Sequence, residues 1–231
     1  MLYAFLLAIG LSLAEFFSER IAERIKHVHA DIVSLNAGIM LSFLFLLFLP
    51  ELFAFQPTLN KPAFFFLFLG IIAFQLGEKF VYRHSKGSQE LRKELALVHL
   101  AGFYITGMVE GMALFFSLNL LGEVGSALLF VPLLLNSVNA SVYGTRISNT
   151  LPKKEWMLSI AATGPLLGFL IAFALPAEGI IAQLVFAFVS GALLFTVFRD
   201  VMPSEKKVNT ELLLIGILVS LLALQVAGLL F

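Results

Sequence analysis

Cysteine is absent from the 231-residue chain, and charged residues make up only 13% of it. Without cysteine, the chain can have neither a disulfide nor a thiolate ligand for a metal ion. Soluble domains contain about 25% charged and roughly 45–50% apolar residues, whereas 60% of this chain is hydrophobic. The composition therefore indicates an integral membrane protein that lies in a lipid bilayer.

Signals of several other protein classes are also missing. The formal net charge is +0, so nothing indicates nucleic acid as a partner. The chain has no HExxH, GxSxG or phosphate-loop motif, and we therefore expect a membrane transporter rather than an enzyme. No basic stretch precedes the first apolar run, so we expect no cleavable signal peptide and interpret Met1 to Phe17 as part of a first span.

The long apolar runs predict an all-α membrane protein with one polytopic domain, residues 1–231. A helix needs about 20 mostly apolar residues to cross the hydrocarbon core. Strands of a membrane barrel would alternate in polarity, and the run "LSFLFLLFLP" (41–50) does not. Eight transmembrane helices are predicted, over residues 2–18, 32–50, 63–80, 95–118, 124–145, 156–175, 180–198 and 211–231.

The basic residues predict the orientation of these spans. Fourteen of the fifteen Lys and Arg residues fall in the first, third, fifth and seventh connections, and Lys61 alone falls in the second. Short basic loops remain on the cytoplasmic side of a membrane. We therefore expect a multi-pass protein of the cell membrane with both termini on the extracytoplasmic side.

Two of the predicted spans have similar sequences. Without gaps, "AGIMLSFLFLLFLPELF" (37–53) aligns with "SGALLFTVFRDVMPSEK" (190–206), so that Gly38 meets Gly191 and Pro50 meets Pro203. The two spans are predicted to run in opposite directions, which is typical of the inverted repeats of secondary transporters. Spans one to three would then repeat as six to eight, with four and five between them.

The stretch "FYITGMVEGMALFF" (103–116) places a single carboxylate, Glu110, near the middle of the fourth span. A charged side chain at that depth costs about 3 kcal/mol on insertion scales, and such residues usually face a partner or a cavity. Thr106 lies four residues earlier, on the same helix face. Gly102, Gly107 and Gly111 remove side-chain bulk, so we expect another helix or a hydrated path to approach closely there.

The fifth span offers partners for Glu110 at the same depth, namely the polar side chains of Asn136, Ser137, Asn139 and Ser141. One carboxylate with neutral oxygens suits a hard or borderline divalent cation. The alternative is structural: a protonated Glu110, hydrogen-bonded to Asn136 or Asn139, would hold two helices together. We favour the metal site because intramembrane ionisable residues usually mark transport pathways.

Other polar residues are weaker candidates. Glu15, late in the first span, is expected to extend toward water at the cytoplasmic interface. Glu51, at the outer end of span two, would attract entering cations, and Arg199 and Asp200 would pair with each other. His99, in the first turns of span four, would either receive a departing metal ion or serve as a polar anchor.

The pattern as a whole resembles the ZIP family of divalent-metal transporters. The likeness covers nearly the entire chain and includes "LPE" (49–51), "LVHLAGFYITGMVEGMALFFS" (97–117) and "GALLFTVFRDVMP" (191–203). It implies a bundle of three, two and three helices with inverted repeats, and a metal site between spans four and five. It also implies homodimers.

The motifs of the ZIP family are only partly present. In span four the family reads His-Asn-x-x-Asp/Glu-Gly, where this chain reads Thr106-Gly107-Met108-Val109-Glu110-Gly111. In span five, His-Glu-x-Pro-x-Glu is replaced by residues 136–141, which lack any imidazole or carboxylate. Imidazole suits zinc and iron, whereas carboxylate and carbonyl oxygens suit magnesium, calcium and manganese. The predicted preference therefore shifts toward harder ions.

These observations lead to two hypotheses for function. In the first, the protein carries a divalent cation (zinc, iron, manganese or another) into the cytoplasm, without a resident cofactor. The predicted metal ligands are Glu110, Thr106, Asn136 and Asn139. In the second, a ZIP-like fold has lost zinc-type transport and serves as a regulatory or scaffold subunit, or carries another solute with Glu110 as a proton-linked group.

Overall fold

A computed structural model describes residues 2–25, 27–54, 57–84, 89–148, 159–175, 179–198 and 209–230. This part of the chain is almost entirely helical and has no strand. The main elements, in chain order, are α1 (Leu2–Ile25), α2 (His29–Phe43), the π-helical turn η1 (Leu44–Phe48), α3 (Leu49–Ala54), α4 (Pro57–His84), α5 (Gln89–Ser148), α7 (Gly164–Ala174), α8 (Ile180–Thr196) and α9 (Thr210–Val226).

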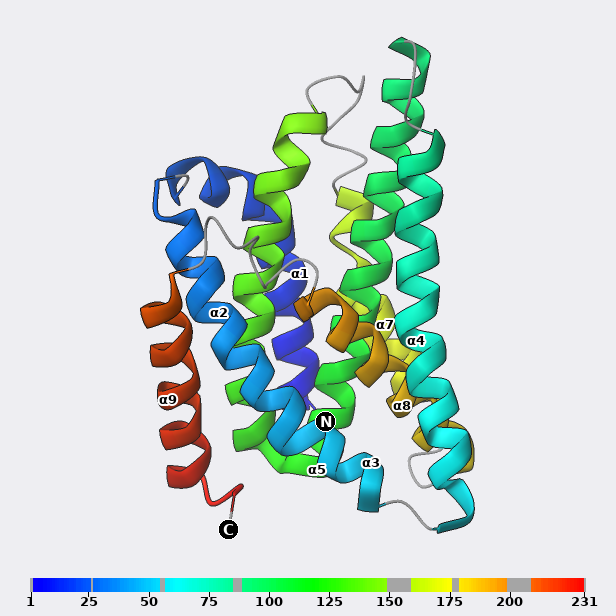
Figure 1. Ribbon diagram of the computed structural model, residues 1–231, viewed down its shortest axis with the longest axis vertical. Coiled ribbons are helices and arrows are strands. Elements are labelled where there is room, and N and C mark those ends of the chain that lie inside the picture. Colours follow the sequence, from blue (N-terminus) through cyan, green and yellow to red (C-terminus); the bar gives the residue numbers. More distant parts are fainter. Residues whose placement is uncertain are drawn as a thin grey trace.

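Helix α5 is a hairpin, because its direction reverses at Gly122. This residue has φ 71° and ψ −167°, a backbone conformation that glycine adopts without the steric penalty of a side chain. Residues 89–121 and 123–148 form the two arms, and Figure 1 shows them side by side in green. The prediction of separate helices over 95–118 and 124–145 therefore agrees with the course of the chain.

The last helix ends earlier than the predicted segment 211–231. Gly228 has φ +67°, and the amide of Leu229 donates to the carbonyl of Leu224 at 3.0 Å. The amide of Gly228 likewise donates to the carbonyl of Gln225, also at 3.0 Å. This pair of bonds around a left-handed glycine is the Schellman motif, which satisfies the last carbonyls of a helix. Helix α9 consequently stops at Val226.

Two helical stretches of the described chain are long and apolar enough to cross a membrane. They are residues 29–54, which comprise α2, η1 and α3, and residues 100–138 within α5. The other apolar helical stretches are shorter and cover residues 2–18, 61–77, 159–174, 180–196 and 210–226. Length and composition alone thus give modest support for a membrane protein.

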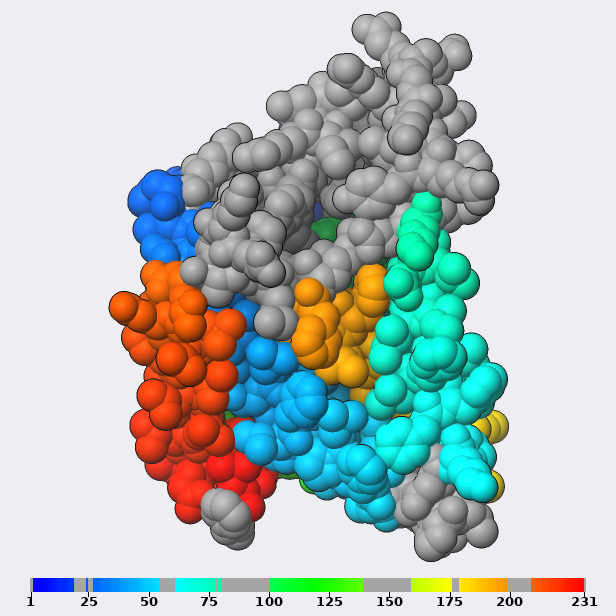
Figure 2. Space-filling model, in the orientation of Figure 1, coloured from blue at the N-terminus to red at the C-terminus, as the bar shows by residue number. Residues whose placement is uncertain are grey.

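Large apolar side chains cover much of the outer surface. Figure 2 shows one face, on which α9, α2 and α4 are prominent. More than half of the side-chain surface is exposed for Phe65, Phe68, Leu214, Leu218 and Leu222. Water-soluble monomers rarely expose large contiguous apolar patches, so this surface fits a lipid environment better than water.

The α5 hairpin packs against both α1 and α7, while α2 lies beside α9 and α4 lies beside α8 (Figure 1). At the α2–α9 contact the backbones touch, because each helix presents a glycine. A methyl group on Gly38 would overlap the carbonyl oxygen of Leu213, and one on Gly216 would overlap that of Leu35. Small residues at such contacts let two helices approach closely.

The α4–α8 contact is built in the same way. A methyl group on Gly70 would overlap the carbonyl oxygen of Phe188, and one on Gly191 would overlap that of Leu67. Gly191 is the residue that the sequence alignment pairs with Gly38. Each of the two aligned glycines therefore lies at a backbone contact with a glycine-bearing partner helix.

A π-helical turn occurs at the same register in both aligned segments. It begins at Leu44, six residues after Gly38, and again at Val197, six residues after Gly191. Pro50 follows the first turn; it lacks an amide hydrogen, and its ring would clash with the carbonyl four residues earlier in a regular helix. Local π-helical geometry is one way to accommodate such a residue.

Candidate functional site

Glu110 lies on the first arm of α5 and is almost completely buried, with 1% of its surface exposed. Its partners are on the second arm. Asn136 Nδ2 donates to Glu110 Oε1 at 2.6 Å, and Ser137 Oγ donates to Glu110 Oε2 at the longer distance of 3.4 Å. The predicted pairing of Glu110 with the polar centre of span five is therefore present in the structure.

The hairpin geometry explains this pairing. Glu110 is twelve residues before Gly122, and Asn136 is fourteen residues after it. Because the arms are antiparallel, residues at nearly equal distances from the turn face each other. Donors that remain beside a buried carboxylate offset part of its desolvation cost. The polar pair thus occupies the interior of the hairpin, where water is excluded.

Thr106, another predicted ligand, is half-buried, and its hydroxyl donates to the carbonyl of Gly102 at 3.0 Å. That bond lies within its own helix, so the structure does not join Thr106 to Glu110 by a hydrogen bond. Its role as a ligand stays a prediction. The side chains of Asn139 and His99, and residues Arg199 and Asp200, lie outside the described part of the chain.

Glu15 corrects the expectation that it extends toward water. It is buried, with 4% of its surface exposed, and its Oε2 atom has no hydrogen-bond partner. Helix α1 continues to Ile25, seven residues beyond the end of the predicted span, so Glu15 is not at the helix end. The general tendency of intramembrane carboxylates to face the bundle interior could have identified it.

The carboxylate of Glu15 lies against Gly107 of the first α5 arm. A Cβ on Gly107 would lie 2.8 Å from Glu15 Oε1 and 3.1 Å from Oε2. Glu15 and Glu110 are close enough to interact electrostatically. The site therefore contains a second carboxylate, contributed by α1, that the sequence did not assign to it.

Helix α7 packs against the same arm of α5 through further glycines. A methyl group on Gly111 would overlap the carbonyl oxygen of Pro165, and one on Gly168 would overlap that of Met108. The expected close approach at Gly107 and Gly111 is thus observed. At Gly102 a methyl group would meet no atom within 4 Å, so no helix packs closely there, and a hydrated path at this position stays a prediction.

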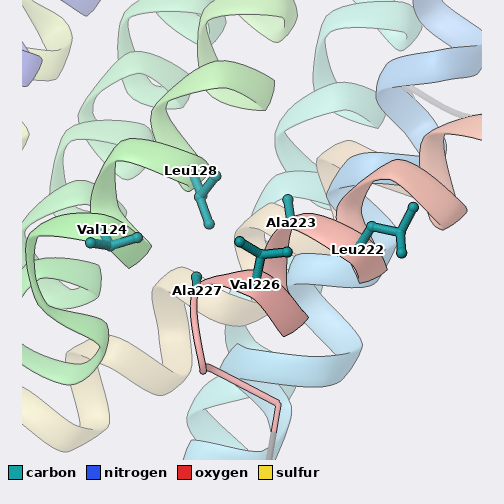
Figure 3. Close-up of a pocket in the computed structure, with 6 residues that line it drawn as sticks. All are labelled: Val124, Leu128, Leu222, Ala223, Val226 and Ala227. Carbon is teal, nitrogen blue, oxygen red and sulfur yellow. The ribbon is translucent and has the colours of Figure 1, made fainter.

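An open groove of about 620 Å³ lies between α9 and the second arm of α5 (Figure 3). Its lining side chains are all aliphatic, so they offer no ligand to an ion. The groove therefore differs chemically from the polar site around Glu110. The lining residues are Val124, Leu128, Leu222, Ala223, Val226 and Ala227.

Among the described residues, no group of three or more His, Cys, Asp or Glu side chains is placed to hold a metal ion. A cation at this site would therefore depend on Glu110, Glu15 and neutral oxygens. Neither a scan against protein-family models nor a search of curated proteins found a match. The function of this protein is therefore inferred from the geometry and chemistry of the residues around Glu110.

Proposed function

We propose that this protein is a ZIP-like membrane transporter that moves a divalent metal cation into the cytoplasm through a site between the two arms of α5. The observation that carries the proposal is the buried Glu110, which has polar partners on the opposite arm. A mid-membrane hydrogen bond contributes only about 0.6 kcal/mol on average. The free energy gained from one such hydrogen bond is therefore too small to explain why a carboxylate is buried at this position.

The proposed bundle has eight spans in an arrangement of three, two and three, with inverted repeats. Under such a repeat, α1 corresponds to α7, the α2 segment to α8, and α4 to α9. The α2–α9 pair then corresponds to the α8–α4 pair, and both pairs meet through glycines. The matching register of the two π-helical turns supports the same correspondence. Inverted repeats commonly enclose a transport site near mid-membrane.

The proposed orientation, with both termini outside, agrees with the course of the helices. In Figure 1 both termini and the turn of α5 lie toward the lower end. The end of α1, the end of α4 and the start of α5 lie at the upper end, next to the basic connections 19–31 and 79–94. Basic loops favour the cytoplasmic side, so the upper end would face the cytoplasm.

Oxygen ligands favour hard or borderline ions such as manganese, magnesium or calcium over softer ones. The side chains described around Glu110 are an amide, a hydroxyl and a second carboxylate, and none is an imidazole or thiolate. We therefore propose manganese-like rather than zinc-like selectivity. Homodimer formation stays a prediction from the family resemblance.

One observation favours the second hypothesis. The 2.6 Å hydrogen bond from Asn136 to Glu110 is the contact that a purely structural pair would make. In a ZIP-fold protein without metal transport, this bond would hold the α5 arms together and nothing would pass between them. In the transporter, the same bond would keep Glu110 in position while no ion is bound.

Uptake of Mn²⁺ into proteoliposomes containing the full-length protein tests the proposal. Glu110→Gln keeps the size of the side chain and removes its charge, so we expect at least a tenfold loss of uptake. Glu211→Gln, at an exposed carboxylate in the first turn of α9, is the matched control and should transport normally. Unchanged uptake in Glu110→Gln, or no uptake of Mn²⁺, Zn²⁺ or Fe²⁺ by the unmodified protein, would favour the second hypothesis.

A further inference from the structure

Glu15 is a buried carboxylate whose Oε2 atom makes no hydrogen bond. Glu110, by contrast, accepts hydrogen bonds from Asn136 and Ser137. A buried ionised group normally persists only with a partner or a counter-ion. Among the described contacts of Glu15 Oε2, neither a hydrogen-bond partner nor a counter-ion is found, so this oxygen still has its lone pairs to offer to a ligand.

The carboxylate of Glu15 occupies the space beside α5 that a side chain at residue 107 would fill. Gly107 has no side chain, and its missing Cβ would lie 2.8 Å from Glu15 Oε1. Any larger residue would push the carboxylate away from this arm. Gly107 is three residues before Glu110, so both positions lie on neighbouring parts of one helix surface. The glycine therefore lets the carboxylate of α1 approach the arm that carries Glu110.

The two carboxylates repel each other when both are ionised, because like charges interact strongly where water is excluded. A cation bound between the two carboxylates would attract both of them and so outweigh their repulsion. Two carboxylates also balance the charge of one divalent ion. Such a cation would be bound by two helices, α1 and the first arm of α5, rather than by the hairpin alone.

We infer that Glu15 is a direct ligand of the transported cation and forms, with Glu110, a two-carboxylate site for a hard divalent ion. This inference rests on the proposed function and deepens it. Asn136 and Ser137 hold Glu110 from the second arm, while Glu15 approaches from α1 beside Gly107. The ion would therefore connect α1 to the α5 hairpin.

Binding of Mn²⁺ to the purified full-length protein, followed by the loss of the free-ion electron paramagnetic resonance signal, tests this inference. Glu15→Gln and Glu110→Gln should each weaken binding at least tenfold, and Glu211→Gln should not. Because the two carboxylates act on one ion, the double variant should lose much less than the product of the single losses. Binding by Glu15→Gln that equals the unmodified protein, with a loss in Glu110→Gln, overturns the inference but leaves the proposed function intact.

A second variant keeps the test independent of the folding of Glu15→Gln. Gly107→Ala retains both carboxylates but places a methyl group within 2.8 Å of the present Glu15 Oε1 position. We expect several-fold weaker Mn²⁺ binding, whereas Gly102→Ala on the same arm should bind normally. Equal binding by these two alanine variants would overturn the inference.

Thermal unfolding separates ligand loss from simple destabilisation. Mn²⁺ should raise the melting temperature of the unmodified protein, since a ligand that binds only the folded state stabilises it. The increase should vanish in Glu15→Gln. In EDTA, Glu15→Gln should melt at or above the temperature of the unmodified protein, because a neutral amide replaces a buried carboxyl group whose Oε2 atom has no partner. A lower melting temperature in EDTA, with a full response to Mn²⁺, would assign Glu15 a structural role instead.

Discussion

The α2–α9 and α4–α8 pairs make the same kind of contact, whereas α1 and α7, which both pack on α5, make different ones. In each pair, glycines bring two backbones together. At Gly107, however, α1 contributes the carboxylate of Glu15 and α7 contributes the ring of Pro165, 3.0 Å from the missing Cβ. The helix pairs are alike in their packing, and the helices around the site differ in their chemistry.

The glycine contacts of the two helix pairs hold the bundle together, whereas the groups beside Gly107 determine the chemistry of the candidate site. Close backbone packing is a steric requirement that a repeated glycine can meet equally well in both halves of the chain. The chemistry beside Gly107 is not the same on its two sides, because α1 contributes a carboxylate and α7 contributes a proline ring. Of the two helices, α1 alone therefore brings a carboxylate to Gly107, and its Oε2 atom has no hydrogen-bond partner.

The largest effect on stability is expected for Gly111→Ala, in the contact between α5 and α7. The added methyl group would overlap the backbone carbonyl of Pro165, which cannot move as a flexible side chain can. We expect a loss of about 3 kcal/mol in the free energy of unfolding, at the upper end for overpacked cores. Steric-trap unfolding in bicelles would measure it.

The control for Gly111→Ala is Gly102→Ala, on the same arm, where the added methyl group meets nothing within 4 Å. Alanine is the better helix former by about 1 kcal/mol, so this variant should be neutral or slightly more stable. Equal stability of the two variants would show that α7 does not pack closely on α5.

Gly38→Ala and Gly191→Ala test whether the two helix pairs are equivalent. Each substitution places a methyl group against a backbone carbonyl of the partner helix, that of Leu213 or of Leu67. We expect similar losses of about 2 kcal/mol in the free energy of unfolding. Gly77→Ala, with open space around its methyl group, is the control. Losses that differ by more than about 1 kcal/mol would contradict equivalent packing, given the usual spread of such changes.

The smallest effect is expected at Asn209, which distinguishes the α2–α9 pair. Its side chain accepts from the amide of Leu212 at 3.3 Å and donates to Asp31 Oδ1 of α2 at 3.1 Å. Asn209→Ala should cost about 1 kcal/mol, as is typical when an N-cap is lost. Asn209→Ser keeps a capping oxygen but loses the bond to Asp31, so it should retain most of the stability in thermal unfolding. A serine variant as unstable as the alanine variant would show that the link to α2, rather than the cap, matters.

The sequence predicted an all-helical chain and placed the candidate partners of Glu110 in the segment that follows Gly122. The length of the apolar runs indicates where a helix can lie, and the break between the runs 95–118 and 124–145 indicated two helices there. The similar depth of Glu110 and the polar residues of span five predicted that they pair, and the structure selects Asn136, whose Nδ2 donates to Glu110 Oε1. The similarity of two segments was also visible in the sequence, since Gly38 and Gly191 align, and both glycines lie at helix contacts in the structure.

Helix ends and helix faces were harder to predict. The sequence shows how far a residue is from the end of an apolar run, and on that basis Glu15 was placed at the interface. Helix α1 instead continues past the apolar run to Ile25. The end of α9 depended on the left-handed conformation of Gly228, a signal that the apolar length of the segment does not contain.

The amino-acid sequence alone predicts a helical, apolar protein with a carboxylate near the middle of its fourth long apolar segment. Local composition is enough for that, because the length and polarity of a run indicate whether it can form an apolar helix. That Glu15 faces Gly107 and lies near Glu110 depends instead on how distant helices pack. The rotation of α1 about its axis and its contact with α5 set that position, and both arise from packing between segments about ninety residues apart.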